Sequence, residues 1–301
     1  MAYFAPAMGL RRYTYIERSR DCEVIASQIE AWGFLPIDIE SNGFYAYFDK
    51  VCLIQISTRE ADYIIDPLRA RDMEWLGRLL RDERILKILH GGDYDIRSFK
   101  RDYKYEFSHV FDTMIAARIL GIPHLGLAAL LKEGFGVDLD KGPQRFNWGT
   151  RPLPIKCLRY AQQDTAYLYR LYKQLQKGLK DRNVMDRAEH EFEHLCQVPP
   201  IHKIFDPMGY HKIRGVKALN GSRKALIQAL YEWRERQAIA RDLPPFRLMT
   251  NDTLMRLMEV LPVTVEKFRI IKGVPRNFRS EDTLAVLSLI EQHHAAITDS
   301  N

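Results

Sequence analysis

Three short apolar segments follow one another near the start of the chain, and turn-like stretches separate them. Residues 34–40, 51–57 and 62–66 have the length and composition of strands. Because consecutive short strands usually pair with their neighbours, these three predict an antiparallel meander. Two more strands are expected at 85–90 and 109–111, where strands alternate with helices and so predict parallel addition to the sheet. The expected fold class is α/β, with a mixed five-stranded sheet and flanking helices.

Helical patterns account for most of the remaining chain. In the first part, helices are expected at residues 71–82, 94–102, 113–121, 125–133, 155–180 and 183–196. Three prolines and a glycine then mark a linker near 197–212. Beyond the linker, a small all-helical bundle is expected, with helices at 216–240, 251–260, 264–270 and 280–294. The chain is thus expected to hold two domains, residues 1–200 and 212–296.

The charge of the chain is unevenly distributed. The net charge is +6, and residues 211–280 contain 15 Lys or Arg against 6 Asp or Glu, so the remainder is slightly acidic. A basic module beside a slightly acidic domain is typical of a protein that binds nucleic acid. A basic surface that is merely solvated is the alternative.

The composition argues against several classes of protein. No stretch approaches 18 consecutive apolar residues, so no membrane span is expected. The apolar N-terminus has its arginines after it rather than before it, which argues against a secretory signal. The four cysteines lie far apart in the sequence and form no CxxC pair, which argues against a disulfide framework or a zinc knuckle. We therefore expect a cytoplasmic protein.

Several acidic residues fall at strand ends and on helix faces. Asp38 and Glu40 are two residues apart at the end of a strand, so both emerge on one face and could hold a divalent metal, or could simply face solvent. Asp95 lies in the first turn of a helix, either at the carboxyl edge of the sheet or favoured there by the helix dipole alone. Tyr160 and Asp164 share one helix face, and an aspartate beside an apolar stripe needs a partner such as a metal. Carboxylates suit Mg²⁺ or Mn²⁺ better than Zn²⁺.

These residues resemble the successive motifs of DEDDy-type 3′-to-5′ exonucleases, which have an RNase H-like (DnaQ-like) fold. The matching motifs are Asp38-Ile-Glu40, His90-Gly-Gly-Asp-Tyr-Asp95, Phe111-Asp112-Thr113 and Tyr160-Ala-Gln-Gln-Asp164. The resemblance is closest to ribonuclease D and the related nuclear-exosome exonuclease, whose W-x-x-R-P-L loop is similar to residues 148–153. Residues 219–294 resemble one HRDC domain, the helical module that ribonuclease D shares with RecQ-type helicases.

The resemblance implies a metal-dependent exoribonuclease. Asp38, Glu40, Asp95 and Asp164 would hold two Mg²⁺ or Mn²⁺ ions about 4 Å apart, one generating a hydroxide nucleophile and the other stabilising the departing 3′ oxygen. Tyr160 would orient the attacking water. The substrate would be single-stranded RNA with a free 3′-hydroxyl, tRNA precursors and other stable RNAs included, and the product a 5′ nucleotide. A monomer is expected.

Two other functions stay open. One is a DNA 3′-to-5′ exonuclease acting on single-stranded DNA, because nothing in the motifs senses the 2′-hydroxyl. The other is a catalytically silent RNA-binding protein. The complete set of four carboxylates and a tyrosine argues against a silent protein, since silent relatives would be expected to lose one of them.

Further residues are candidates for substrate binding. Three of them would contact the nucleic-acid strand: His90, Trp148 and Arg151. The alternatives are a structural role for the histidine and a role as loop anchors for Trp148 and Arg151. In the second domain, the candidate phosphate contacts are Arg234, Arg236, Arg241, Arg247, Lys272, Arg276 and Arg279. Among these, Arg234, Arg241 and Lys272 are predicted as substrate-binding residues, with a protein-docking surface as the alternative.

Two motifs are assigned to structural roles. His190-Glu-Phe-Glu-His194 matches the HExxH pattern of zinc metalloproteases, but the charged surroundings and the lack of an evident third ligand favour a solvated helix face. Asp112 stands between a strand and a helix, which favours helix capping over metal contact.

Overall fold

The computed structural model describes residues 10–140, 142 and 144–298, so the start of the stretch considered above as a secretory signal lies outside the described residues. Two compact units are present. Unit 1 comprises Met1–Asn42 and Lys50–His202, and unit 2 comprises Gly43–Asp49 and Lys203–Asn301. The division after His202 falls within the expected linker, whereas the assignment of Gly43–Asp49 to unit 2 was not anticipated. Within the described ranges, no helix is both long and apolar enough to cross a membrane.

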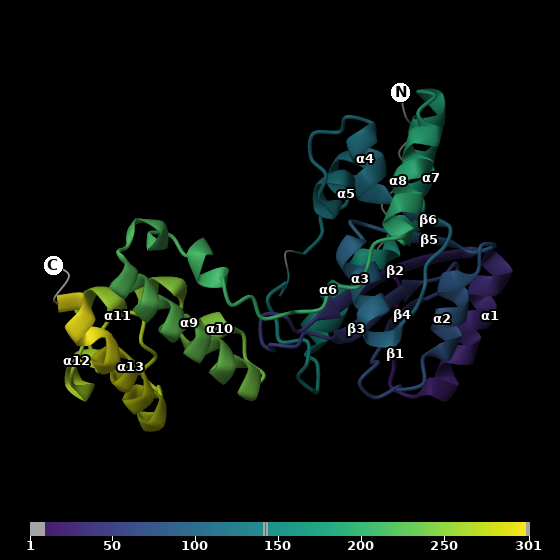
Figure 1. The fold of residues 1–301 in the computed structure, drawn as a ribbon. Helices are drawn as coiled ribbons and strands as arrows, with labels where there is room; N and C mark the ends of the chain where they lie inside the picture. The colour runs from purple at the N-terminus through teal and green to yellow at the C-terminus, as the bar shows by residue number, and fades with distance from the viewer. Residues whose placement is uncertain (1–9, 141, 143, 299–301) are drawn as a thin grey trace. The chain divides into compact units, whose positions relative to one another are not determined.

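Unit 1 is built on one mixed sheet with the strand order β1-β4-β3-β2-β5-β6 (Figure 1). The strands are β1 (Tyr13–Ile16), β2 (Phe34–Ser41), β3 (Val51–Ser57), β4 (Asp62–Ile65), β5 (Leu86–Leu89) and β6 (Val110–Asp112). The antiparallel meander of β2, β3 and β4 and the parallel addition of β5 and β6 are both as predicted. The fold class is confirmed, but the sheet in the described residues has six strands rather than five.

The unpredicted strand is β1, which pairs in parallel with β4 at the edge of the sheet. It has four residues, and Ile16 is the one among them that is buried. A strand this short, with a mostly solvated surface, lacks the apolar alternation by which a strand is detected in a sequence. The prediction of five strands was wrong for this reason.

Helices flank the sheet (Figure 1). They are α1 (Glu23–Trp32), α2 (Glu74–Arg81), α3 (Asp93–Tyr103), α4 (Thr113–Ile119), α5 (Leu127–Phe135), α6 (Ile155–Ala166), α7 (Leu168–Asp181) and α8 (Met185–Cys196). Helix α1 was not predicted. The main core lies between the sheet and these helices and is rich in Ile, Leu and Phe.

The single long helix expected at residues 155–180 is in fact two helices, α6 and α7. The break is at Tyr167, whose φ of −111° and ψ of −4° depart from regular helix. Neither Gly nor Pro marks it, so the sequence carries no break signal. Helix α6 packs on β2, β3 and β4, while α7 packs on α4, α5 and α8 and also reaches β2 and β5. Helix α6 is thereby brought to the strands that carry the acidic residues.

Unit 2 is an all-helical bundle. Its helices are α9 (Gly221–Ala240), α10 (Pro245–Leu248), α11 (Asn251–Val260), α12 (Val265–Arg269) and α13 (Ser280–Thr298), of which the short α10 was not predicted. Asn220, Thr250 and Thr264 begin α9, α11 and α12 by accepting hydrogen bonds from backbone N–H groups of the first turn. The bundle has its own apolar core around Leu230 and Phe268.

Candidate active site

Strand β2 carries the first two acidic residues of the site. Leu35, Ile37 and Ile39 are buried in the main core, whereas Asp38 and Glu40 alternate with them and remain half-buried. Helix α6 packs against β2 and β3. The pairing of β2 with β3 shifts register directly after Glu40, so the regular ladder is disrupted where the acidic pair ends.

The turn between β5 and α3 positions Asp95. Gly91 has a φ of +67°, a conformation that favours glycine, and a Cβ at Gly92 would lie 2.6 Å from a methyl carbon of Leu89. The two glycines therefore allow the chain to turn tightly from the end of β5 into α3. Asp95 then falls in the first turn of α3 and is buried.

Helix α6 carries the remaining two residues of the candidate site. Tyr160 and Asp164 are four residues apart on this helix, so they share a face, and both are half-buried. The structure thus brings together the five residues that the sequence separates by as many as 126 positions (Asp38 to Asp164).

The carboxylates act on one another electrostatically. Burial raises the pKa of Asp38 to about 7. Burial, together with the charges of Asp38, Asp164 and Asp95, holds the pKa of Glu40 well above its usual range. Burial also raises the pKa of Asp95, and the charges of Asp38, Asp112 and Asp164 raise it further. For Asp164 the causes are burial and then Asp38. Each carboxylate is therefore close enough to the others to disfavour their ionisation.

The donor set fits a hard divalent cation. In the described residues, none of these four carboxylates has a Lys, Arg or His ion-pair partner, so a bound cation would be the compensating charge. The same residues contain no group of three or more His, Cys, Asp or Glu side chains already close enough to enclose an ion. Among the described residues the four carboxylates therefore do not form a ready-made ligand shell.

The raised pKa values predict how the metal-free protein responds to pH. A carboxyl with a higher pKa in the folded chain binds more protons when folded, so stability falls as the pH rises from the unfolded to the folded pKa. For Asp38 this window runs from about pH 4 to about 7. With chelator present, we expect a lower melting temperature at about pH 8 than at about pH 5, and a smaller difference in Asp38→Asn. Equal melting temperatures for the wild type at both pH values would contradict the raised pKa.

Two loop segments confine the Tyr160 ring. The Trp148 indole stacks on it, with 6.3 Å between ring centroids and 26° between the planes. A Cβ at Gly142 would lie 2.5 Å from a carbon of the phenol ring, so the backbone there lies directly against the tyrosine. Burial and the charges of Asp164 and Glu40 raise the pKa of Tyr160, while a hydrogen bond with Gln144 lowers it. The phenol therefore stays protonated at neutral pH.

Comparison with known proteins identifies the family of this chain. Residues 13–180 match the family described as 3′-5′ exonuclease. The chain belongs to this family. Residues 223–290 match the HRDC domain, so the bundle of unit 2 contains an HRDC domain. The resemblance drawn from the sequence motifs is confirmed.

Individual relatives support the family assignment. The exosome complex component 10 homolog of Caenorhabditis elegans is 33% identical over 83% of this chain. The catalytic core of RRP6 from Trypanosoma brucei superposes with a TM-score of 0.88 and 25% identity. The match covers 97% of this chain and 82% of the RRP6 chain. Escherichia coli RNase D superposes with a TM-score of 0.71 and 25% identity. The match covers 94% of this chain and 76% of the RNase D chain. The chain spans only 29 to 46% of the first curated relatives' length.

Asp112 and His90 have structural partners in this exonuclease fold. One oxygen of Asp112 accepts hydrogen bonds from the backbone N–H groups of Met114 and Ile115 and so caps α4, as predicted. The other accepts from the N–H of Gly92. His90 Nδ1 lies 2.9 Å from the hydroxyl of Thr113. Of the two interpretations of His90, this contact supports the structural one.

The two predicted substrate contacts of the W-x-x-R-P-L loop, Trp148 and Arg151, have partners within the fold. Trp148 is 1% exposed, and Arg151 donates to Asp66 and to backbone carbonyls. Of the two interpretations of these residues, the intramolecular contacts support the loop anchor. Asp66, 85 positions away, supplies a partner that the local sequence does not reveal.

Two of the three residues predicted to contact phosphate in the HRDC-containing unit have hydrogen-bond partners within the protein. Arg234 is 4% exposed and donates to the Met249 carbonyl, and Arg241 makes a two-point ion pair with Asp282. These contacts support structural roles for both arginines, and charge counting in a sequence cannot reveal such partners. Lys272 is exposed and stays a candidate.

The HExxH pattern lies on α8. His190 and His194 are exposed, while the interspersed Phe192 is buried on the core side. The interpretation as a solvated helix face therefore agrees with the structure.

Two polar residues near the site were not identified from the sequence. Gln144 hydrogen-bonds Tyr160 from a loop whose Gly- and Pro-rich composition hid any functional signal. Gln55 lies opposite Asp38 in the pairing of β2 with β3 and is fully buried. Directly opposed residues share one face, so Gln55 places an amide beside Asp38. A polar residue within the otherwise apolar segment 51–56 is the signal that could have revealed it.

Proposed function

We propose that this chain is a metal-dependent 3′-to-5′ exoribonuclease that releases 5′ nucleotides from RNA. The observation that carries the proposal is the cluster of Asp38, Glu40, Asp95 and Asp164, whose carboxylates mutually raise their pKa values beside Tyr160. A cluster of acidic groups without basic partners is suited to divalent cations, which favour the ionised carboxylates. Membership of the 3′-5′ exonuclease family supplies the reaction class.

The roles of the residues follow from their positions. Asp38, Glu40, Asp95 and Asp164 would hold two Mg²⁺ or Mn²⁺ ions, which when bound supply an activated water and neutralise charge on the leaving 3′ oxygen. The Tyr160 hydroxyl, protonated at neutral pH, would orient the attacking water by hydrogen bonding rather than remove its proton. Gln144 would set the direction of that hydroxyl.

The names of relatives favour RNA as the substrate. One solved relative is described as an exoribonuclease involved in structured RNA processing, and several curated relatives are exosome components. We extend this to the 3′ ends of single-stranded RNA, tRNA precursors included. A monomer in a reducing cytoplasm stays part of the proposal, and the four free cysteines of the described residues support a reducing compartment.

The proposal is tested with labelled single-stranded RNA and DNA of equal sequence, each with a free or a phosphate-blocked 3′ end. With Mg²⁺ or Mn²⁺ we expect stepwise shortening of the RNA with a free end alone. Equal shortening of the DNA would favour the DNA exonuclease. No shortening of either polymer with any metal would favour a silent RNA-binding protein.

The HRDC-containing unit is proposed to hold the RNA electrostatically. Replacing the exposed Lys272 by Ala should raise KM and leave kcat unchanged, and the slope of log KM against log salt should fall by about one. Lys177→Ala, an exposed lysine on α7, is the matched control and should change neither quantity. An unchanged salt dependence in Lys272→Ala would contradict a phosphate contact there.

A further inference from the structure

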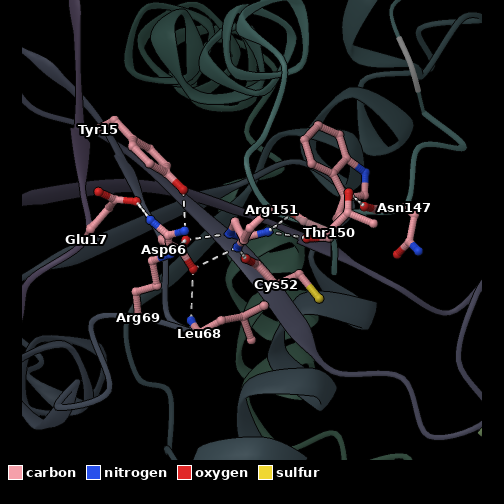
Figure 2. Close-up of polar contacts among 10 residues, drawn as sticks. Tyr15, Glu17, Cys52, Asp66, Leu68, Arg69, Asn147, Thr150 and Arg151 are labelled. Carbon is pink, nitrogen blue, oxygen red and sulfur yellow. Dashed lines mark hydrogen bonds and ion pairs between the residues drawn. The ribbon is translucent and has the colours of Figure 1, made fainter.

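A buried ion pair joins three separate parts of unit 1 (Figure 2). Asp66 follows β4 and is fully buried. One of its oxygens accepts hydrogen bonds from the Tyr15 hydroxyl on β1, at 2.8 Å, and from Arg151 Nε, at 2.5 Å. The other accepts from Arg151 Nη2 at 2.7 Å and from the Leu68 backbone N–H at 3.0 Å. Such two-point pairing fixes the guanidinium in both position and orientation.

All five N–H groups of Arg151 are used within this network. Besides the bonds to Asp66, Nη1 donates to the carbonyls of Trp148 and Thr150, both at 2.7 Å. Nη2 also donates to the carbonyl of Cys52 on β3 at 2.8 Å. Figure 2 shows the guanidinium lying between Asp66 and the loop backbone. In this arrangement Arg151 offers no donor to a substrate phosphate.

The Asp66 carboxylate stays ionised. Burial would raise its pKa, but hydrogen bonds from Arg151 and Tyr15 and the charge of Arg151 outweigh burial and hold the pKa below its usual value. Charge compensation therefore favours the bonded arrangement of the loop.

The carbonyl of Trp148, which Arg151 holds, belongs to the residue whose indole stacks on Tyr160. The indole is 1% exposed and packs with Cys157 and Leu158 of α6, the helix that carries Tyr160. A chain of direct contacts thus runs from Asp66 through Arg151 and Trp148 to the phenol ring.

We propose that Asp66 and Arg151 are positioning residues for catalysis, which fix the loop of residues 146–153 so that Trp148 holds Tyr160 in place at the carboxylates. The inference rests on the proposed exonuclease function and assigns Arg151 a role distinct from substrate binding. A displacement of about 1 Å in a water-orienting group can cost about 10²-fold in rate. The effect belongs in kcat, because no substrate contact is lost.

Arg151→Lys is the informative substitution. Lysine keeps the charge but cannot reproduce the planar, five-donor geometry. We expect kcat to fall by about 10-fold or more, with KM changed less than about 2-fold. The matched control is Arg69→Lys, because Arg69 also approaches Asp66, at 3.8 Å, but is half exposed and pairs with Glu17. It should behave as wild type.

A double-mutant cycle separates positioning from binding. If Arg151 acts through Tyr160, adding Arg151→Lys to Tyr160→Phe should reduce kcat by less than about 2-fold further. Fully additive losses, or a loss confined to KM, would overturn the inference. Should Arg151→Lys fail to fold, Tyr15→Phe, which removes one hydrogen bond to Asp66, should show a smaller kcat loss that also vanishes beside Tyr160→Phe.

A spectroscopic readout makes failure of the inference distinguishable from failure of the proposed function. With 5-fluorotryptophan in the four Trp positions, Trp148→Phe identifies the ¹⁹F resonance of Trp148. We expect this resonance to shift or broaden in Arg151→Lys but not in Arg69→Lys. An unchanged resonance would overturn the inference even in an active enzyme. If the resonance shifts in Arg151→Lys but the wild-type protein cleaves no RNA, the exonuclease proposal alone would be refuted.

Discussion

Replacing Asp38 or Asp95 with asparagine is expected to abolish exonuclease activity while leaving the fold intact. Each substitution removes a carboxylate from the cluster that would hold the metal ions. Losing a single transition-state donor costs about 10² to 10³-fold in kcat, so a loss of at least about 10³-fold is expected when the metal site is disrupted. Single-turnover cleavage of labelled RNA measures the effect.

Asp93→Asn is the matched control for Asp95→Asn. Asp93 lies in the same first turn of α3, but its side chain is 57% exposed and pairs with Arg97. The control should keep wild-type turnover. Asp95→Asn should melt no lower than wild type in chelator, because it removes a buried, mutually repelling charge. Near-normal turnover by either Asp38→Asn or Asp95→Asn would refute the assigned site.

Removing divalent metal is expected to have an equally large effect. With EDTA, cleavage should fall below detection, and excess Mg²⁺ or Mn²⁺ should restore it. The same ions should raise the melting temperature of the wild type, because a ligand that binds the folded state alone stabilises it. The rise should be greater at about pH 8 than at about pH 5, because the carboxyls must lose their protons to bind metal.

Asp38→Asn provides the control for this measurement. Its melting temperature should respond less to Mg²⁺ than that of the wild type, since one ligand is missing. Metal ions that stabilise the wild type and Asp38→Asn equally would place the binding elsewhere. Cleavage that persists in excess chelator would contradict metal dependence altogether.

The sequence predicts this site well where the chemistry is local. The two-residue spacing of Asp38 and Glu40 puts both on one strand face, and the four-residue spacing of Tyr160 and Asp164 puts both on one helix face. Periodicity alone fixes these relations. The HGG turn that precedes Asp95 is equally local, because its glycines permit the tight turn.

Features that depend on distant partners could not be predicted. Arg151 and Arg234 are of a residue type that commonly contacts phosphate. Inside the fold, however, Arg151 donates to Asp66 and Arg234 donates to the Met249 carbonyl. The break between α6 and α7 at Tyr167 has no local signal in the sequence, and the two helices pack on largely different sets of elements. Tertiary contacts override local propensity in each case.

Identification of the released product tests the central claim most directly. RNA with a free 3′-hydroxyl is incubated with the protein and Mg²⁺, and the small products are separated by mass. Attack of a metal-activated water at the 3′-terminal linkage predicts nucleoside 5′-monophosphates, absent with EDTA and with Asp38→Asn. Nucleoside 3′-phosphates, or no nucleotide release from RNA under any metal condition, would contradict the assignment of these four carboxylates as an exoribonuclease site.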